Sequence, residues 1–268
     1  GLPTNQDHEL PNRPENWEDP VAQKNWRRIA AETHRINHSD RSKRLQTSKV
    51  LHLAQKFRGR AIYFPKQCDF RGRTYDIPSP LNCQGASVAK ALLRFDKGDP
   101  IENQKEANWL AVQAANTWGH DKKTFAYRVK WVWENEELFK QIAKDPLGYT
   151  QWKDADSPWE FLDAAIEVGE FLDQGYGYVS RVPVAQDASN QGLQIYSLLL
   201  RDEEAALSTN VLPSPEPQDL YQEVADRVTA RLKQSDSPYA AGWLKFKINR
   251  ATTKRQTLVL PYGGTKQS

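Results

Sequence analysis

The chain has 268 residues, a net charge of +3 and a hydrophobic fraction of 38%. Its length allows one large domain or two smaller ones. No apolar stretch approaches the roughly 18 residues that span a membrane, and the polar, proline-rich start does not resemble a signal peptide. The only cysteines, Cys68 and Cys83, lack the spacing of metal ligands and indicate a reducing compartment. We therefore expect an intracellular protein with no membrane partner.

The charges are segregated along the chain. From Arg41 to Arg60 there are seven basic residues and no acidic one, and from Ser237 to Ser268 there are six basic residues and no acidic one. Such runs predict positive surfaces that face a polyanion, usually nucleic acid. The alternative is that they are ordinary solvated helix faces. The absence of methionine indicates a fragment, a processed chain or a recoded sequence.

The first elements are helical. Residues 1–19 are expected to form an extended lead-in, after which Asp19 and Pro20 suit the N-cap and first turn of a helix. Two helices are expected, separated by the polar tripeptide Asn37-His38-Ser39: about 20–36 and about 40–58.

A short apolar strand is expected over 60–64, where Pro65 ends it. A tight turn with alternating cations follows at 69–75. Ser87 is typical of a helix N-cap, and that helix is expected to run to about Phe95. Longer helices are expected at about 102–118, 122–143 and 158–173.

The alternating segment 176–186 indicates a strand that places Asp187 at its end. A carboxylate at such a position can bind a hard cation such as Mg²⁺. An aspartate that merely caps the following helix is an equal alternative. The remaining helices are expected at about 191–201, 218–233 and 239–260.

The last of these helices carries a regular pattern. Arg250, Lys254, Leu258 and Tyr262 are four residues apart and lie close to one helix face. Cations can hold a triphosphate, and an aromatic ring suits a ribose or base. The Gly263-Gly264 pair lets the backbone turn or approach a ligand. The alternative is an ordinary basic amphipathic helix with a glycine cap.

Taken together, the segments VPVAQDASNQG and RATTKRQTLVLPYG resemble motifs A and B of the single-subunit, phage-type (T7-like) RNA polymerases. FPKQCDFRGRTYDIP and DSPWEFLDAAIEVG resemble two upstream segments of that family. The resemblance covers nearly all of residues 20–268, with the motifs in the same order. It implies an α/β, mostly helical fold, part of the palm and fingers of a right-hand polymerase. The expected divisions are 1–58, a lead-in and connector, 59–212, the palm portion with motif A, and 213–268, the start of the fingers.

The resemblance also implies roles for individual residues. Asp187 matches the motif A aspartate that binds two catalytic Mg²⁺ ions. The substrate-binding residues are a second group, of which Lys254 and Tyr262 also count as catalytic: Arg250, Lys254, Tyr262, Gly263 and Lys130. A third group matches positions that contact the template or hybrid: Arg71, Arg73, Tyr75 and Lys90.

One position bears on the sugar. Related DNA polymerases have a bulky glutamate five residues after the motif A aspartate, where it blocks the ribose 2′-hydroxyl. This chain has Gly192 there, and Leu258 where those enzymes have an aromatic residue. The resemblance therefore implies that the substrates are ribonucleotides.

The implied function is DNA-templated RNA synthesis by a two-Mg²⁺ mechanism, with DNA template, RNA product and NTPs as partners. The family's motif C, a His-Asp pair that supplies the second metal carboxylate, is not found in these residues. We therefore expect no polymerisation by the chain alone, unless a second chain supplies that motif. The alternative function is a non-catalytic module that binds single strands or a hybrid. The expected location is the host cytoplasm if the source is a phage, in preference to a mitochondrion or plastid, because no transit peptide is evident.

Overall fold

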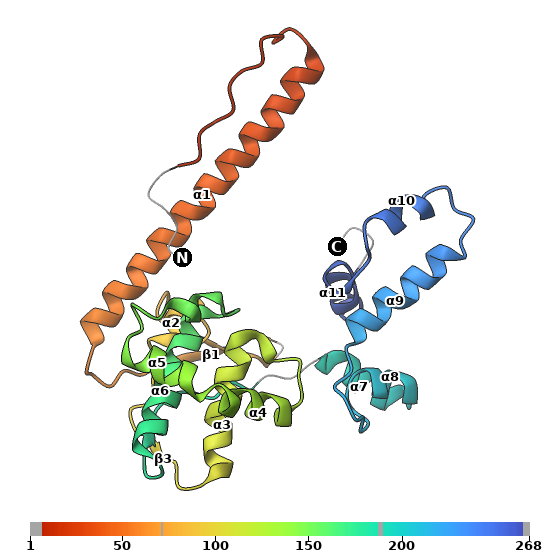
Figure 1. Ribbon diagram of the computed structural model, residues 1–268. Coiled ribbons are helices and arrows are strands. Elements are labelled where there is room, and N and C mark those ends of the chain that lie inside the picture. The colour runs from red at the N-terminus through yellow and green to blue at the C-terminus, as the bar shows by residue number, and fades with distance from the viewer. Residues whose placement is uncertain (1–6, 71, 187–189, 265–268) are drawn as a thin grey trace. The chain divides into compact units, whose positions relative to one another are not determined.

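The computed structural model describes residues 7–70, 72–186 and 190–264. The predicted residues Arg71 and Asp187 lie outside these ranges. The chain divides into two compact units, Gly1–Asp121 with Arg128–Val184, and Lys122–Tyr127 with Ala185–Ser268. Helices dominate both units, as predicted (Figure 1). No helix in the described ranges has the length and apolar character needed to cross a membrane.

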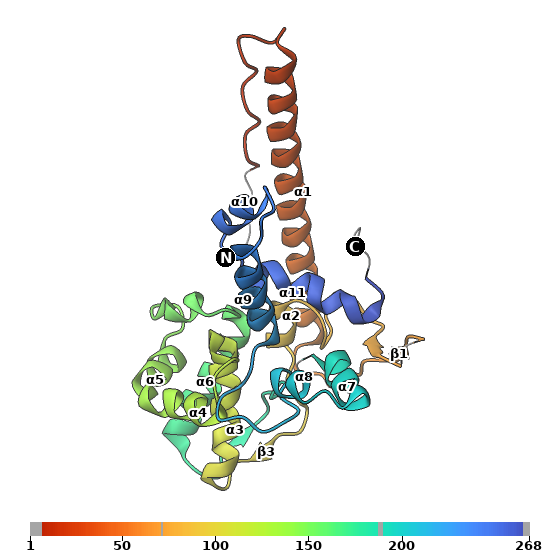
Figure 2. The same cartoon turned by 90° about the vertical axis from the view of Figure 1, so that its right-hand side faces the viewer.

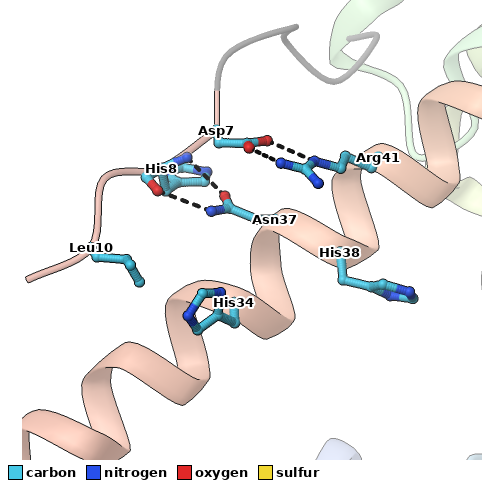
Figure 3. Close-up of a pocket in the computed structure, with 7 residues that line it drawn as sticks. All are labelled: Asp7, His8, Leu10, His34, Asn37, His38 and Arg41. Atoms are coloured by element: carbon cyan, nitrogen blue, oxygen red, sulfur yellow. Dashed lines mark hydrogen bonds and ion pairs between the residues drawn. The ribbon is translucent and has the colours of Figure 1, made fainter.

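The first unit begins with the long helix α1, Pro20–Phe57. The Asp19 side chain accepts hydrogen bonds from the amides of Val21 and Ala22, which confirms the predicted start. The predicted break at 37–39 is wrong. Asn37 exchanges two hydrogen bonds with the backbone of His8, at 2.8 and 2.9 Å (Figure 3), so its amide does not compete with the helix backbone.

The lead-in runs back beside α1 (Figures 1 and 2). Nε of Arg41 donates to Asp7 over 3.0 Å (Figure 3). Nearer the start of α1, Trp26 donates to the carbonyl of Pro11 over 2.9 Å, and Trp17 packs edge-on against Trp26. A shallow pocket lies between the lead-in and α1, lined by Asp7, His8, Leu10, His34, Asn37, His38 and Arg41. Residues 7–14 have no helix or strand, as expected of an extended lead-in, whereas residues 15–18 form a turn before α1.

A hairpin follows α1. Strands β1, Lys66–Cys68, and β2, Thr74–Asp76, pair antiparallel, with Gln67 opposite Tyr75. The predicted turn is confirmed, because the amide of Gly72 donates to the carbonyl of Asp69. The predicted strand at 60–64 is wrong. The turn pairs residues 66–68 with residues 74–76, and residues 60–64 have no partner strand in the described ranges. Helix α2, Ser87–Ala91, is shorter than predicted, and the predicted N-cap is wrong because the helix begins at Ser87 itself and Ala86 occupies the N-cap position.

The core of the first unit is formed mainly by helices α3, α5 and α6. Their buried side chains include Leu110, Phe139, Phe161 and Val168. Gly169 brings α6 against α5, since a Cβ there would lie 2.7 Å from the carbonyl oxygen of Phe139. The elements of this part are β3 (Asp99–Pro100), α3 (Gln104–Ala115), the π-helix η1 (Asn116–His120), α4 (Phe125–Glu134), α5 (Glu136–Lys144), the 3₁₀ helix η2 (Thr150–Asp154), α6 (Pro158–Gln174) and β4 (Val179–Ser180).

Two predictions for this region need correction. The helix expected at 122–143 is two helices, separated at Asn135, whose side chain donates to the carbonyl of Trp131 instead of continuing the helix. The strand expected at 176–186 pairs only at Val179–Ser180, opposite the two residues of β3. The helices expected at 102–118 and 158–173 are confirmed by α3 with η1 and by α6.

A charged network fixes the segment that leads toward Asp187. Arg94 donates from Nε to Asp163 over 3.0 Å and from Nη1 to Glu167 over 2.5 Å. Glu167, which is 1% exposed, also accepts a bond from the hydroxyl of Ser180 over 2.9 Å. The amide of Phe95 donates to the carbonyl of Arg181. Residues 178–182 are therefore tied to α6 before the chain enters the second unit.

In the described ranges, the regular elements of the second unit are all helices, joined by loops. Its elements are α7 (Gln191–Leu200), α8 (Glu203–Ser208), α9 (Leu220–Lys233), α10 (Ala240–Lys245), α11 (Arg250–Val259) and the 3₁₀ turn η3 (Leu260–Tyr262). The helices predicted at 191–201 and 218–233 are confirmed. The single helix predicted at 239–260 is wrong: Lys247 adopts a left-handed φ of 46°, and Asn249 caps a new helix.

Candidate nucleotide-binding site

Helix α11 carries the predicted phosphate-binding residues, and its start is strongly specified. The Asn249 side chain accepts bonds from the amides of Ala251 and Thr252, while the Thr252 hydroxyl pairs with the amide of Asn249. This capping box satisfies amides that a helix start otherwise leaves unbonded. The cap therefore fixes where the helix begins, at Arg250.

The same turn is fastened to helix α9. The buried hydroxyl of Thr253 donates to the backbone carbonyl of Tyr221 over 2.7 Å, and the amide of Arg250 donates to Gln222 over 3.3 Å. Since α9 and α11 pack closely in this unit (Figure 1), the first turn of α11 has a defined position relative to α9.

Arg250 is held by an acidic residue. Its Nε donates to Oδ2 of Asp219 over 2.6 Å, and its guanidinium carbon lies 5.3 Å from the ring centre of Tyr221. Asp219 also caps α9 by accepting from the amides of Tyr221 and Gln222. Among the described residues, the terminal amino groups of Arg250 make no hydrogen bond. These groups can bind a phosphate while Nε stays anchored.

Lys254 lies one turn further along α11 and is exposed. Within the described ranges it has no ion pair. Leu258, a further turn on, is 43% exposed. The predicted spacing of four residues is therefore realised on one continuous helix for Arg250, Lys254 and Leu258. An exposed amine next to an anchored guanidinium is suited to neutralise a polyphosphate.

The glycine pair closes the end of α11. Gly263 has φ 80° in the left-handed region, and the amide of Gly264 donates to the carbonyl of Val259 over 3.0 Å. These are features of a glycine C-cap. A Cβ on Gly264 would lie 2.9 Å from that carbonyl oxygen. The pair thus ends the helix, and the backbone of Tyr262 forms the last residue of η3.

Helix α7 meets this end of α11. The hydroxyl of Tyr196 donates to the carbonyl of Pro261 over 3.3 Å. Gly192, the predicted sugar-facing residue, is the second residue of α7. The N-cap position of α7 is Asn190, and Asp187 lies three residues before it, outside the described ranges. Tyr196 thus links the helix that follows Asp187 to the turn that contains Tyr262.

The other predicted site residues lie in the first unit. Lys130 is exposed on α4 and lies 3.6 Å from Glu134. Nζ of Lys90 lies 2.9 Å from a carboxylate oxygen of Glu160 on α6. Both are accessible cations with a local acidic partner.

Two more predicted residues lie on the hairpin. Arg73 is exposed, and its amide donates to the Asp69 side chain over 3.0 Å. Tyr75 is 37% exposed on β2. The hairpin is fastened to the following loop because the Asp76 carboxylate accepts from the amide of Cys83, and Gln84 donates to the carbonyl of Thr74. The hairpin can therefore present both side chains on a supported backbone.

No group of three or more His, Cys, Asp or Glu side chains that could hold a metal occurs in the described ranges. The described residues near α11 thus offer cations and no metal site of their own.

The sequence of this chain matches a known protein family. The family model of DNA-dependent RNA polymerases matches residues 101–268. The chain belongs to this family. The match includes α7, α9 and α11, so the anchored Arg250 and the exposed Lys254 lie in a segment that DNA-dependent RNA polymerases share.

Individual polymerases of this family match nearly the whole chain. T7 RNA polymerase of Escherichia phage T7 is 34% identical over 291 residues, which cover 98% of this chain and 33% of the phage protein. The mitochondrial DNA-directed RNA polymerase of Schizosaccharomyces pombe is 34% identical over 262 residues, covering 96% and 23%. The human mitochondrial enzyme is 34% identical over 253 residues, covering 92% and 20%. The chain thus spans about a third of the phage relative's length and less of the mitochondrial ones.

Several residues that build the candidate site were not predicted from the sequence. Asp219 and Thr253 position α11, and Tyr196 connects α7 to its end. Asp219 had a local signal, because an aspartate before an apolar-periodic segment is a typical N-cap. Its bond to a residue 31 positions away had no local signal.

Proposed function

We propose that the protein to which this chain belongs synthesises RNA on a DNA template, and that α11 holds the incoming ribonucleoside triphosphate. The main support is the pair of cations on one face of α11, within a segment matched by the polymerase family. One of them, Arg250, is anchored by Asp219 with its terminal amino groups unbonded among the described residues, and the other, Lys254, is exposed. Fixed cations need little reorganisation when charge develops on the leaving group.

In nucleotidyl transfer, the 3′ oxygen of the growing RNA forms a bond to the α-phosphorus. The bond from that phosphorus to the bridging oxygen breaks, and pyrophosphate leaves. Catalysis consists mainly of positioning and charge neutralisation. Arg250 and Lys254 would bind the β- and γ-phosphates and stabilise the charge that passes to pyrophosphate. Tyr262 and Gly263 would lie beside the nascent base pair, and Lys130 would be a further triphosphate cation.

We assign the metal to Asp187. Mg²⁺, when bound, would supply charge neutralisation at the reacting phosphate. A single carboxylate together with substrate phosphates is a usual setting for this ion. The second carboxylate of a two-metal site, and a second chain that carries it, remain predictions. The assignment of 59–212 to a palm and of 213–268 to fingers also remains a prediction, as does an intracellular location.

Nucleotide binding is the direct test. The 268-residue chain is titrated with a fluorescent ribonucleoside triphosphate in the presence of Mg²⁺. Lys254→Ala should weaken binding about tenfold, the loss typical of one charge-assisted contact to phosphate. Lys233→Ala, an exposed lysine at the end of α9, is the matched control and should bind normally. Equal affinity for both variants would refute the assignment of α11.

The sugar preference is tested at Gly192. Gly192→Glu should lower the affinity for a ribonucleoside triphosphate and leave that for the matching deoxyribonucleoside triphosphate nearly unchanged. The reason is that the larger side chain would occupy the space of the 2′-hydroxyl. Equal losses for both nucleotides would instead indicate a disrupted α7.

A second candidate function, nucleic-acid binding without catalysis, is favoured by the hairpin that presents Arg73 and Tyr75. Together with Arg71 and Lys90, these residues would contact the template or hybrid. A pure binding module would show salt-sensitive oligonucleotide binding and no Mg²⁺-dependent nucleotide binding.

A further inference from the structure

Helix α10 and the two residues that flank it present three large aromatic side chains to solvent. Tyr239, Trp243 and Phe246 are 75%, 59% and 76% exposed. They stand at positions i, i+4 and i+7 around the six-residue helix, and this spacing places them on one side. The rings of Trp243 and Phe246 have centroids 6.3 Å apart at an interplanar angle of 61°. We name this side of the helix, with Tyr239 and the paired rings of Trp243 and Phe246, the α10 aromatic surface.

These rings do not serve the packing of their own unit. The residue of α10 that is buried is Ala240, and α10 packs on α9 in this unit. A helix that buries an alanine and exposes a tryptophan and a phenylalanine gains little from folding. Contiguous exposed apolar groups of this kind commonly mark a binding surface.

The charges around the rings indicate the type of partner. Lys245 and Lys247 are exposed, and in the described ranges neither has an ion pair. The sequence from Ser237 to the C-terminus contains no acidic residue. A partner with an apolar surface would leave these amines without a counter-charge, whereas a polyanion would satisfy them.

We propose that the α10 aromatic surface, with Lys245 and Lys247, is a docking site for single-stranded nucleic acid. Exposed bases would stack on the rings, and the two amines would contact adjacent phosphates. Every base has a flat face, so such a site tolerates many sequences. A duplex would bind less well because its bases are already stacked on one another. The inference rests on α10 and does not depend on nucleotide binding by α11.

The test uses the 268-residue chain without nucleotide. A single-stranded oligothymidylate that carries one 5-iodouracil is irradiated with the protein, and the crosslinked peptides are identified. Crosslinks in 239–246 support the proposal, since this base reacts with aromatic rings that stack on it. In parallel, fluorescence anisotropy measures the affinity of a labelled oligothymidylate and of a duplex of the same length.

Two substitutions separate ring stacking from folding. Trp243→Ala should weaken single-strand binding about tenfold, a factor within the range of one base–aromatic contact. Trp243→Phe retains a flat ring and should stay close to the unchanged chain. Tyr63→Ala removes another exposed aromatic ring, 88% exposed, and is the matched control that should bind normally.

The contribution of the lysines is measured by the salt dependence of binding. Lys245→Ala should reduce the slope of log affinity against log salt by about 0.7, the value for one phosphate contact to a single strand. The proposal is overturned if Trp243→Ala binds the oligonucleotide as tightly as the unchanged chain, or if the duplex binds equally well. It is also overturned if Trp243→Ala changes the oligomeric state, which would identify the surface as a protein contact.

Discussion

The guanidinium of Arg250 and the carboxylate of Asp219 join the first turns of two helices. Nε of Arg250 donates to Oδ2 of Asp219 over 2.6 Å, while Oδ1 of the same carboxylate caps α9. One acidic side chain therefore fixes both a helix start and a residue 31 positions later. Under the proposed function, this contact holds the guanidinium in place before the triphosphate binds, which would lower the entropy lost on binding.

The two roles of Asp219 can be separated by substitution. Asp219→Asn keeps an N-cap oxygen and loses the charge, so the free energy of unfolding should fall by about 0.5–1 kcal/mol, as for a partly exposed ion pair. Asp219→Ala also loses the cap and should cost about 1 kcal/mol more. Urea unfolding followed by circular dichroism measures both. Equal losses for the two variants would show that the cap contributes nothing.

Thr253 fastens α11 to α9 through its hydroxyl. Thr253→Val keeps the shape but leaves the carbonyl of Tyr221 without its 2.7 Å hydrogen bond, so the free energy of unfolding should fall by about 1–2 kcal/mol. Amide hydrogen exchange in the first turn of α11 should become faster. Thr253→Ser keeps the hydroxyl and is the control that should retain slow exchange. Fast exchange in both variants would show that the hydroxyl is not what holds this turn in place.

The parts of this fold that were predicted correctly are those that a local sequence pattern specifies. Asp19 before Pro20 specifies a helix start by itself, and the long helices α6 and α9 follow their apolar periodicity. The helix breaks at Asn135 and Lys247 were not predicted. A side-chain hydrogen bond accompanies the first break and a left-handed backbone conformation the second, and apolar periodicity indicates neither. For the site, the spacing of Arg250 and Lys254 is a local property. The hydrogen bonds from Arg250 to Asp219 and from Tyr196 to Pro261 depend on how the helices pack. They join residues far apart in the sequence, so no local pattern predicts them.

The glycine pair at the end of α11 offers a prediction about backbone geometry. Gly264→Ala places a Cβ 2.9 Å from the carbonyl oxygen of Val259, so the helix end has to shift. Gly263→Ala puts a side chain on a residue with φ 80° and should cost about 1 kcal/mol. Thermal unfolding should show the larger loss for Gly264→Ala.

A matched control for these glycines is Gly242, which lies inside α10, where an added Cβ would meet no other described part of the chain within 4 Å beyond its own helix backbone and neighbours. Gly242→Ala should stabilise the protein by about 0.5–1 kcal/mol, because alanine favours a helix interior. A loss of stability in this control would mean that the glycine effects do not report on the end of α11.

The Arg94 network allows a prediction about pH. Burial raises the pKa of the Asp163 carboxyl above its usual range, and the attraction and hydrogen bond of Arg94 oppose that rise. Burial likewise opposes the charge of Arg94, but Asp163 and Glu167 outweigh it and raise the arginine's pKa. The arginine thus holds two acidic side chains of α6 that have little contact with water.

Arg94→Met should lower the free energy of unfolding by about 2–3 kcal/mol at neutral pH, somewhat below the usual cost of breaking a buried pair because Arg94 is partly exposed. Without the arginine, the pKa of Asp163 rises further. A carboxyl whose folded pKa is raised contributes stability that is present below its unfolded pKa and is lost as the pH rises through its folded pKa. The variant should therefore recover part of its loss as the pH falls from 7 toward 5, more than the unchanged chain does. Lys97→Met, an exposed lysine three positions away, should show neither effect. A loss from Arg94→Met that is the same at pH 5 and pH 7 would contradict the role given to Asp163, because an uncompensated carboxylate has to respond to protonation.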